Sequence, residues 1–392
     1  MANKVVYPYI PNSEPSIKKE MMDYVGVKNE DELYEEIPDF LKYDGLLNLP
    51  DAILDEYSIK KNVDGILGKN VNCSEFSSFL GAGCAKHYTP AVCDDLLSRG
   101  EFLTCYSGTQ YCDHGKYQIL FEFQSLICAL VGMEFTTNPC HDGSQAVATS
   151  LCMSNRLTGR RKVLLPASMN PQILAVVRNY LNAVHPENRL DIELVDYDKE
   201  TGLMSLEDLK KKLDDTVAGV LVENPCFLGN LEVNAAEIGK MVRENGSEFI
   251  VYVDPISMGV MDFPANYGAT IVCGDIHSLG LHLSSGGAQA GFIAVHDDMR
   301  YMVETKEMVY SIMPTIDNDD SFGFARALFE RTHYAQREKG KEFTGTQSNL
   351  WTLPVAAYLS MMGPEGMREV GETIMTNALY GARKWNRYPA SA

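Results

Sequence analysis

Apolar runs and amphipathic stretches alternate along the middle of the chain. Short apolar runs bounded by polar turn residues predict strands at Lys162–Leu165, Asp191–Val195, Val217–Val222, Phe249–Val253 and Ala269–Cys273. Between them, apolar residues three and four positions apart predict helices at Pro171–Val184, Ser205–Leu213 and Asn234–Glu244. This alternation favours an α/β domain with a mostly parallel sheet and helices on both faces.

The flanking regions read as helical. Amphipathic spacing predicts helices at Ser16–Tyr24, Glu30–Glu36, Pro90–Leu97, Tyr117–Val131, Gln145–Asn155, Met299–Tyr310, Phe322–Lys339 and Leu353–Met362. We expect three parts: an N-terminal arm or helical extension (1–65), a large α/β domain (66–297) and a helical small domain (298–392). The last part offers no closing strands, so we expect it to be partial or truncated. The first part is typical of an arm that wraps a partner subunit, or of a loosely packed extension.

Charge and cysteine usage narrow the class of protein. The 392 residues carry a formal charge of −19, which argues against nucleic acid and anionic membranes as partners. Ten cysteines without a C-x-x-C pair suit a reducing compartment, and no basic-then-apolar leader or apolar run of about 18 residues is present. We expect a cytoplasmic protein. Cys105, Cys112 and His114 match no common zinc spacing, so we expect no metal site.

Polar residues follow several predicted strands or open predicted helices. They lie at Asp142–Ser144, Asn224–Phe227, Asp254 and His277–Ser278. In parallel sheets such residues meet at the carboxyl edge, where ligands bind. Gly143 and Ser144 begin a predicted helix, whose first backbone amides can bind a phosphate or another anion, or a water molecule.

The stretch from Phe249 to Val295 has the layout of pyridoxal-phosphate enzymes with the aspartate-aminotransferase fold. In that fold an aspartate at a strand end meets the pyridinium nitrogen, and a lysine on the turn after the next strand forms the Schiff base. Asp254 stands at the first position, but no lysine occurs between Lys240 and Lys306. His277 and Ser278 occupy the turn instead, which predicts a cofactor scaffold without its covalent anchor.

Asp254 and His277 each allow a functional and a purely structural interpretation. Asp254 either binds a pyridinium nitrogen or only caps local backbone amides. His277 either orients a substrate carboxylate or is a solvated turn residue. We expect no catalytic residue on this chain and treat Asp254, Gly143, Ser144 and Ser278 as a pseudo-site.

The chain resembles subunit 1, the α subunit, of the two-subunit glycine cleavage system P-protein, the decarboxylating glycine dehydrogenase. The resemblance runs from Tyr9 to about Gly371. Matching stretches are FLGAG (79–83), HYTPAV (87–92), LLSRGEFLTCY (96–106), FEFQSLICALVGM (121–133), LTGRRKVL (157–164), VDPISMG (253–259), SLGLHLSSGG (278–287) and MMGPEGMRE (361–369).

The resemblance implies a large domain of the aspartate-aminotransferase type (fold type I) and a heterotetramer with subunit 2. It implies that subunit 2 holds pyridoxal 5'-phosphate on a lysine, and that Ser278 stands where this lysine would be. Glycine would be decarboxylated at a site completed by both subunits, and the aminomethyl group would pass to lipoylated H-protein. Tyr106, Gln110 and His277 are the candidates for reaching the partner's site.

Four places depart from the family's pattern: residues 107–116, Asn170, Cys226 and residues 340–348. Two other functions therefore stay open. One is a non-catalytic assembly or regulatory paralogue, and the other is a decarboxylase of the same fold that acts on another amino acid. A homodimer also stays open beside the heterotetramer.

Overall fold

The chain divides into two compact units, residues 1–76 and 77–392. The computed structural model describes residues 6–7, 9–43, 45, 47–71, 75–79, 85–102, 116–136, 139–182, 189–283, 290–305, 309–317, 320–327 and 348–385.

The first unit consists of short helices joined by extended segments. It contains α1 (Pro15–Val25), α2 (Glu56–Leu67) and single turns of 3-10 helix. None of its described residues is buried. On α1 the apolar residues Ile17, Met21 and Tyr24 recur at helical spacing along one exposed face. Helices of this length are marginal in water without a packing surface. The arm predicted for this region stays a prediction.

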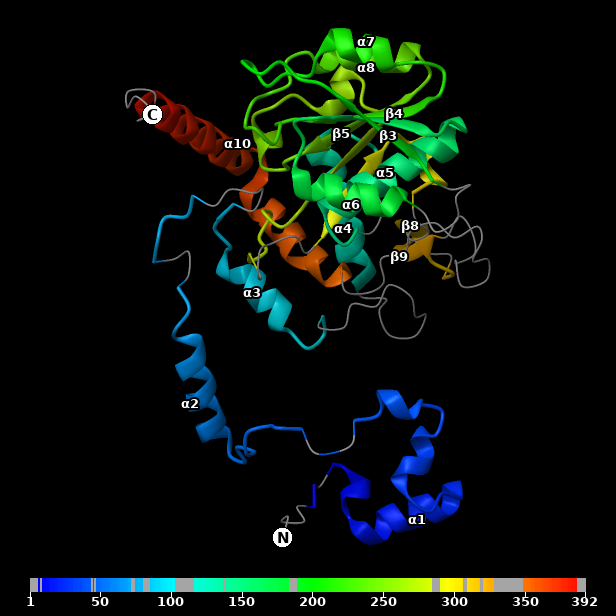
Figure 1. Cartoon of the computed structure of the whole chain (residues 1–392). Coiled ribbons are helices and arrows are strands. Elements are labelled where there is room, and N and C mark those ends of the chain that lie inside the picture. The colour runs from blue at the N-terminus through cyan, green and yellow to red at the C-terminus, as the bar shows by residue number, and fades with distance from the viewer. Residues whose placement is uncertain are drawn as a thin grey trace, which may run out of the picture. The chain divides into compact units, whose positions relative to one another are not determined.

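The second unit is built on a seven-stranded sheet (Figure 1). Its strand order is β1-β7-β6-β5-β4-β2-β3. The bounds are β1 Phe135–Thr136, β2 Lys162–Pro166, β3 Asp191–Val195, β4 Val217–Glu223, β5 Glu248–Val253, β6 Ile271–Asp275 and β7 Gly291–Val295. Strands β3, β2, β4, β5 and β6 are parallel, while β7 and β1 are antiparallel to their neighbours. The predicted α/β class with a mostly parallel sheet is therefore confirmed.

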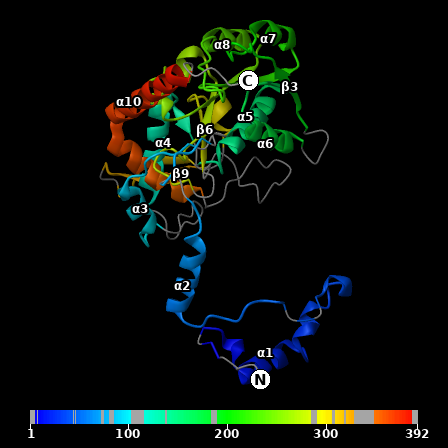
Figure 2. The same cartoon turned by 60° about the vertical axis from the view of Figure 1, so that its left-hand side comes forward.

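Helices cover both faces of this sheet because its strands are apolar on both sides. On β5, Val251 faces one core cluster and Ile250 faces the other. The first cluster contains side chains of α4 (Tyr117–Val131), α7 (Leu206–Lys212), α8 (Ala235–Glu244) and α10 (Thr352–Trp385). The second contains side chains of α5 (Gly143–Thr158) and α6 (Pro171–Leu181). Figure 2 shows the same layers from a second direction.

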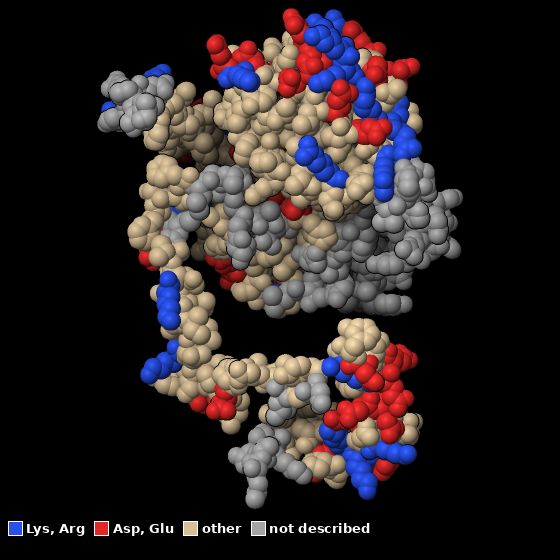
Figure 3. Space-filling view, in the orientation of Figure 1, with Lys and Arg blue, Asp and Glu red and all other residues tan. Residues whose placement is uncertain are grey.

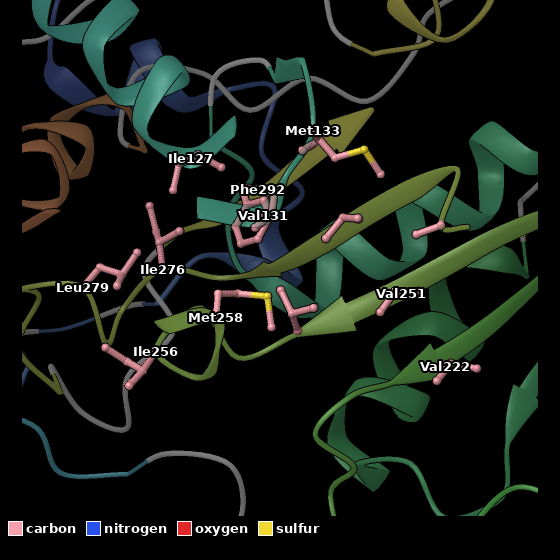
Figure 4. Close-up of a cluster of buried hydrophobic side chains, with 14 of the residues drawn as sticks. Ile127, Val131, Met133, Val222, Val251, Ile256, Met258, Ile276, Leu279 and Phe292 are labelled. Atoms are coloured by element: carbon pink, nitrogen blue, oxygen red, sulfur yellow. The ribbon is translucent and has the colours of Figure 1, made fainter. Parts of the chain in front are cut away.

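The first core cluster supports the region just beyond the strand ends. Figure 4 shows Ile127 and Val131 of α4 beside Phe292 of β7, with Ile276 and Leu279 close by. Ile276 and Leu279 are fully buried. The turn that follows β6 is therefore fixed by apolar packing on both sides of His277 and Ser278.

Most predicted elements match the structure within a few residues, but two helices were wrong. Only Met299–Met302 (α9) is helical in the first, and Val309–Pro314 forms β8. The second begins as β9 (Phe322–Ala327), which pairs with β8 in an antiparallel hairpin. Tyr310 is buried against Tyr117 of α4, and its backbone N–H donates to Gln124 Oε1. Packing on α4 therefore decides the structure of a run whose pattern suits either element. Residues 328–339 lie outside the described residues.

Helix α3 (Ala91–Ser98) packs against helix α10. Helix α10 is interrupted at Gly363, whose φ is +61°, and Pro364 follows. Gly363 and Pro364 therefore separate two helical segments. Lysine and arginine alternate with aspartate and glutamate over α7 and α8 at the top of Figure 3. No helix among the described residues is long and apolar enough to cross a bilayer.

Candidate functional site

The carboxyl ends of three neighbouring parallel strands carry acidic residues. Glu223 ends β4, Asp254 follows β5, and Asp275 ends β6. The order β4-β5-β6 brings these ends side by side, and the backbone N–H of Asn224 donates to the carbonyl oxygen of Tyr252 at 2.9 Å. The predicted convergence of the residues after these strands at one edge is confirmed.

Asp254 holds the turn that leaves β5. Its Oδ1 accepts a hydrogen bond from the backbone N–H of Ile256 at 3.1 Å, and its carbonyl oxygen accepts from the N–H and hydroxyl of Ser257. Asp254 remains accessible to solvent, yet protein atoms crowd its carboxyl group. The resulting dehydration raises its pKa, while the hydrogen bond from Ile256 and the nearby His277 act in the opposite direction. Asp254 thus has the local capping role that the sequence allowed.

Asp275 links the end of β6 to the start of α5. Its Oδ2 accepts a hydrogen bond from the backbone N–H of Gly143 at 3.0 Å. Its Oδ1 accepts from the backbone N–H of His277 at 2.8 Å and lies 3.0 Å from His277 Nδ1. Because a carboxylate oxygen only accepts, Nδ1 carries a proton in this contact. One carboxylate therefore fixes both the helix start and the orientation of the imidazole.

His277 is buried, which differs from the solvated reading of this residue. Only 9% of it is exposed, and its Nε2 has no hydrogen-bond partner among the described residues. His87, from the segment before α3, lies edge to face against it with ring centroids 5.1 Å apart. His87 Nε2 in turn contacts the carbonyl oxygen of Leu281. The two histidines tie residues far apart in the sequence to the turn after β6.

The carboxyl group of Glu223 is buried at this edge. Only 4% of the residue is exposed, and burial raises its pKa to about 7 against 4.5 for an ordinary glutamate. Backbone N–H groups of Asn170 and Phe227 donate to it at 3.4 and 3.3 Å and partly oppose this shift.

The structure brings Gly143, Asp254 and His277 to the same edge, with Ser144 and Ser278 as their direct neighbours in the chain. Tyr106 and Gln110 lie outside the described residues. Sequence reasoning missed His87, Glu223 and Asp275 as site residues. The signal for Asp275 was present, because it stands directly at the end of a predicted strand and two positions before His277.

The profile of the family "Glycine cleavage system P-protein" matches residues 8–390. A probable glycine dehydrogenase (decarboxylating) subunit 1 of Staphylothermus marinus is 36% identical over 389 residues, covering 95% of this chain and 80% of the relative. The chain belongs to the glycine cleavage system P-protein family. A probable subunit 1 of the same enzyme from Bacillus cytotoxicus is 32% identical, covering 97% of this chain and 83% of the relative.

Solved structures agree with this membership. A crystal structure of glycine decarboxylase (P-protein) of the glycine cleavage system, in inhibitor-bound form, superposes with a TM-score of 0.77 at 30% identity and covers 93% of this chain and 78% of that chain. A sphingosine-1-phosphate lyase of Burkholderia pseudomallei shares the fold at 12% identity, with a TM-score of 0.61 over 90% of this chain and 79% of that chain. The predicted fold type I of pyridoxal-phosphate-dependent enzymes is confirmed.

The residues present in this P-protein chain do not fit pyridoxal phosphate as their own cofactor. No amine is available for a Schiff base on the turn after β6, where Ser278 stands. The backbone N–H of Gly143, at the helix start expected to cradle a phosphate, already donates to Asp275. Oδ1 of Asp254 is likewise already used by the backbone N–H of Ile256.

Proposed function

We propose that this chain is the subunit of glycine decarboxylase that does not anchor the cofactor. In this proposal, subunit 2 holds pyridoxal 5'-phosphate on a lysine, and the two subunits together complete the site that decarboxylates glycine and passes the aminomethyl group to lipoylated H-protein. The observation that carries it is Ser278 on the turn after β6, in a chain of P-protein membership. The relatives are named as subunit 1 of a decarboxylating glycine dehydrogenase, which supports subunit 2 as partner.

In this role the chain's own residues position and shield rather than react. Apolar packing of Ile276 and Leu279 holds the turn after β6, while the contacts of His87 with His277 and Leu281 hold it from the other side. A rigid edge of this kind would close one side of a shared cavity and exclude water from it. Tyr106, Gln110 and His277 remain the candidates for contact with the partner's site.

A cytoplasmic location belongs to the same proposal. Four of the described cysteines are free thiols: Cys93, Cys128, Cys226 and Cys273. Thiols are kept reduced in the cytosol, where P-protein would also meet its lipoylated partner.

The experiment is a reconstitution. Each subunit is purified alone, the two are mixed, and glycine–bicarbonate exchange is followed with lipoylated H-protein. We expect no exchange from this chain alone and full exchange from the mixture. If adding this chain to subunit 2 does not raise the exchange rate, an assembly or regulatory paralogue is favoured. If this chain alone turns over another amino acid, an independent decarboxylase is favoured.

A further inference from the structure

The N-terminus of α5 is occupied by carboxylates of the chain itself. Helix α5 begins at Gly143 and runs for 16 residues, so its first backbone N–H groups form a strong anion site when free. The N–H of Gly143 donates to Asp275 Oδ2 at 3.0 Å. The N–H of Gln145 donates to Oδ1 of Asp142 at 2.7 Å. Two carboxylates therefore already use the positive end of the helix.

Asp275 is held firmly in this position. Its other oxygen accepts from the backbone N–H of His277 and lies 3.0 Å from His277 Nδ1, so both oxygens are engaged. Ile276, the next residue, is fully buried in the core. The packing of Ile276 keeps the backbone at Asp275 from swinging away. An incoming anion would therefore have to displace the side chain itself and break its hydrogen bonds to Gly143 N–H, His277 N–H and His277 Nδ1.

Little space separates the strand ends from the helix start. A Cβ atom on Gly143 would lie 2.8 Å from Tyr252 Oη and 3.0 Å from Asp275 Cβ. Burial raises the pKa of Tyr252 well above its usual value, and the carboxyl groups of Asp275, Glu223 and Asp254 act in the same direction. The surroundings of the helix start are therefore both tight and acidic.

We propose that Asp275 is a built-in ligand of the α5 N-terminus that closes this half of the P-protein to phosphate. This inference rests on the proposed function, in which subunit 2 holds the cofactor. It gives a physical reason why this chain does not hold a second one. The missing lysine accounts only for the missing covalent bond. Asp275 in addition occupies the backbone N–H that would bind the phosphate group of pyridoxal phosphate.

The test is anion binding to the full-length isolated chain, measured by isothermal titration calorimetry with inorganic phosphate and, separately, with pyridoxal phosphate. Asp275→Ser removes both the charge and the hydrogen-bond acceptor. Asp298→Ser is the matched control, since Asp298 caps another helix start by accepting from the N–H of Arg300 at 2.8 Å. Circular dichroism and thermal unfolding confirm that each variant is folded.

We expect Asp275→Ser to bind phosphate at least tenfold more tightly than the unchanged chain, and Asp298→Ser to match the unchanged chain. A smaller gain, or an equal gain in the control, would overturn the proposal. If the serine variant does not fold, Asp275→Asn keeps the side-chain shape and removes the charge, and a gain below threefold there would count against it equally. Because subunit 2 is absent from this assay, its result is independent of the reconstitution that tests the proposed function.

Discussion

The imidazole of His87 packs edge to face against that of His277, and it also contacts the carbonyl oxygen of Leu281. One side chain from the segment before α3 thus holds the turn that follows β6. This turn carries Ser278, the residue on which the proposed function rests.

Replacing His87 by alanine should loosen this turn. The variant loses a ring contact and a hydrogen bond, so we expect a fall of about 1–2 kcal/mol in the free energy of unfolding. Urea unfolding followed by circular dichroism measures it. Tyr88→Ala is the neighbouring control, because Tyr88 is 80% exposed, and its change should stay within about 0.5 kcal/mol. Equal losses in the two variants would show that His87 has no special part in holding the turn.

Glu223 should make stability depend on pH. Its pKa is about 7 in the folded chain and near 4.5 when unfolded, so the folded state binds more protons between these values. Its contribution is fully present below about pH 4.5 and is lost as pH rises through about 7. Glu223→Gln should therefore lie within about 1 kcal/mol of the unchanged chain at pH 5 and exceed it at pH 8 by about 3 kcal/mol.

The measurement for Glu223 is urea unfolding at pH 5 and pH 8, with the exposed Glu207→Gln as a control for the loss of one surface charge. Glutamine retains an acceptor oxygen for the backbone N–H groups of Asn170 and Phe227. A difference between Glu223→Gln and the unchanged chain that is the same at both pH values would contradict the assignment.

A side chain at Gly291 should disrupt the junction between β7 and α5. A Cβ atom there would lie 2.3 Å from the carbonyl oxygen of Asp142, and backbone atoms cannot move aside as a flexible side chain can. We expect Gly291→Ala to lose about 2–4 kcal/mol of stability, in the range of strained or overpacked core changes. Gly381→Ala is the control: apart from the backbone of α10 itself, no atom of the described residues lies within 4 Å of its Cβ position, so helix propensity should leave stability equal or slightly higher.

Tyr301 should matter through its hydroxyl group. This hydroxyl donates to Glu248 Oε2 at 2.9 Å, and Arg300 lies 2.7 Å from the other oxygen of the same buried carboxylate. Tyr301→Phe leaves Glu248 with one partner fewer, so we expect a loss of about 1–3 kcal/mol in thermal or urea unfolding. Tyr24→Phe, on an exposed tyrosine of α1, should change nothing measurable.

Much of the sheet could be predicted from the sequence because its strands are buried on both faces and read as apolar runs. The runs containing Val217–Val222 and Phe249–Val253 became central strands for this reason. The hairpin of β8 and β9 could not be predicted, because its structure depends on contact with Tyr117 and Gln124 of α4. Local pattern carries no information on such distant contacts.

The candidate site divides in the same way. Asp254 and His277 were visible because they follow predicted strands. The role of Asp275 as acceptor for the N–H of Gly143 could not be predicted. Gly143 lies 132 positions earlier in the chain, and the spacing gives no sign of this contact. His87 was hidden because its partner in the fold is 190 residues away (277 − 87).

In the proposed assembly, subunit 2 carries the cofactor of the P-protein and this chain does not. The most direct measurement is borohydride reduction of the assembled complex, followed by intact mass spectrometry of each separated subunit. We expect a pyridoxal phosphate adduct on subunit 2 and an unmodified mass for this chain. A reduced adduct on this chain would contradict it.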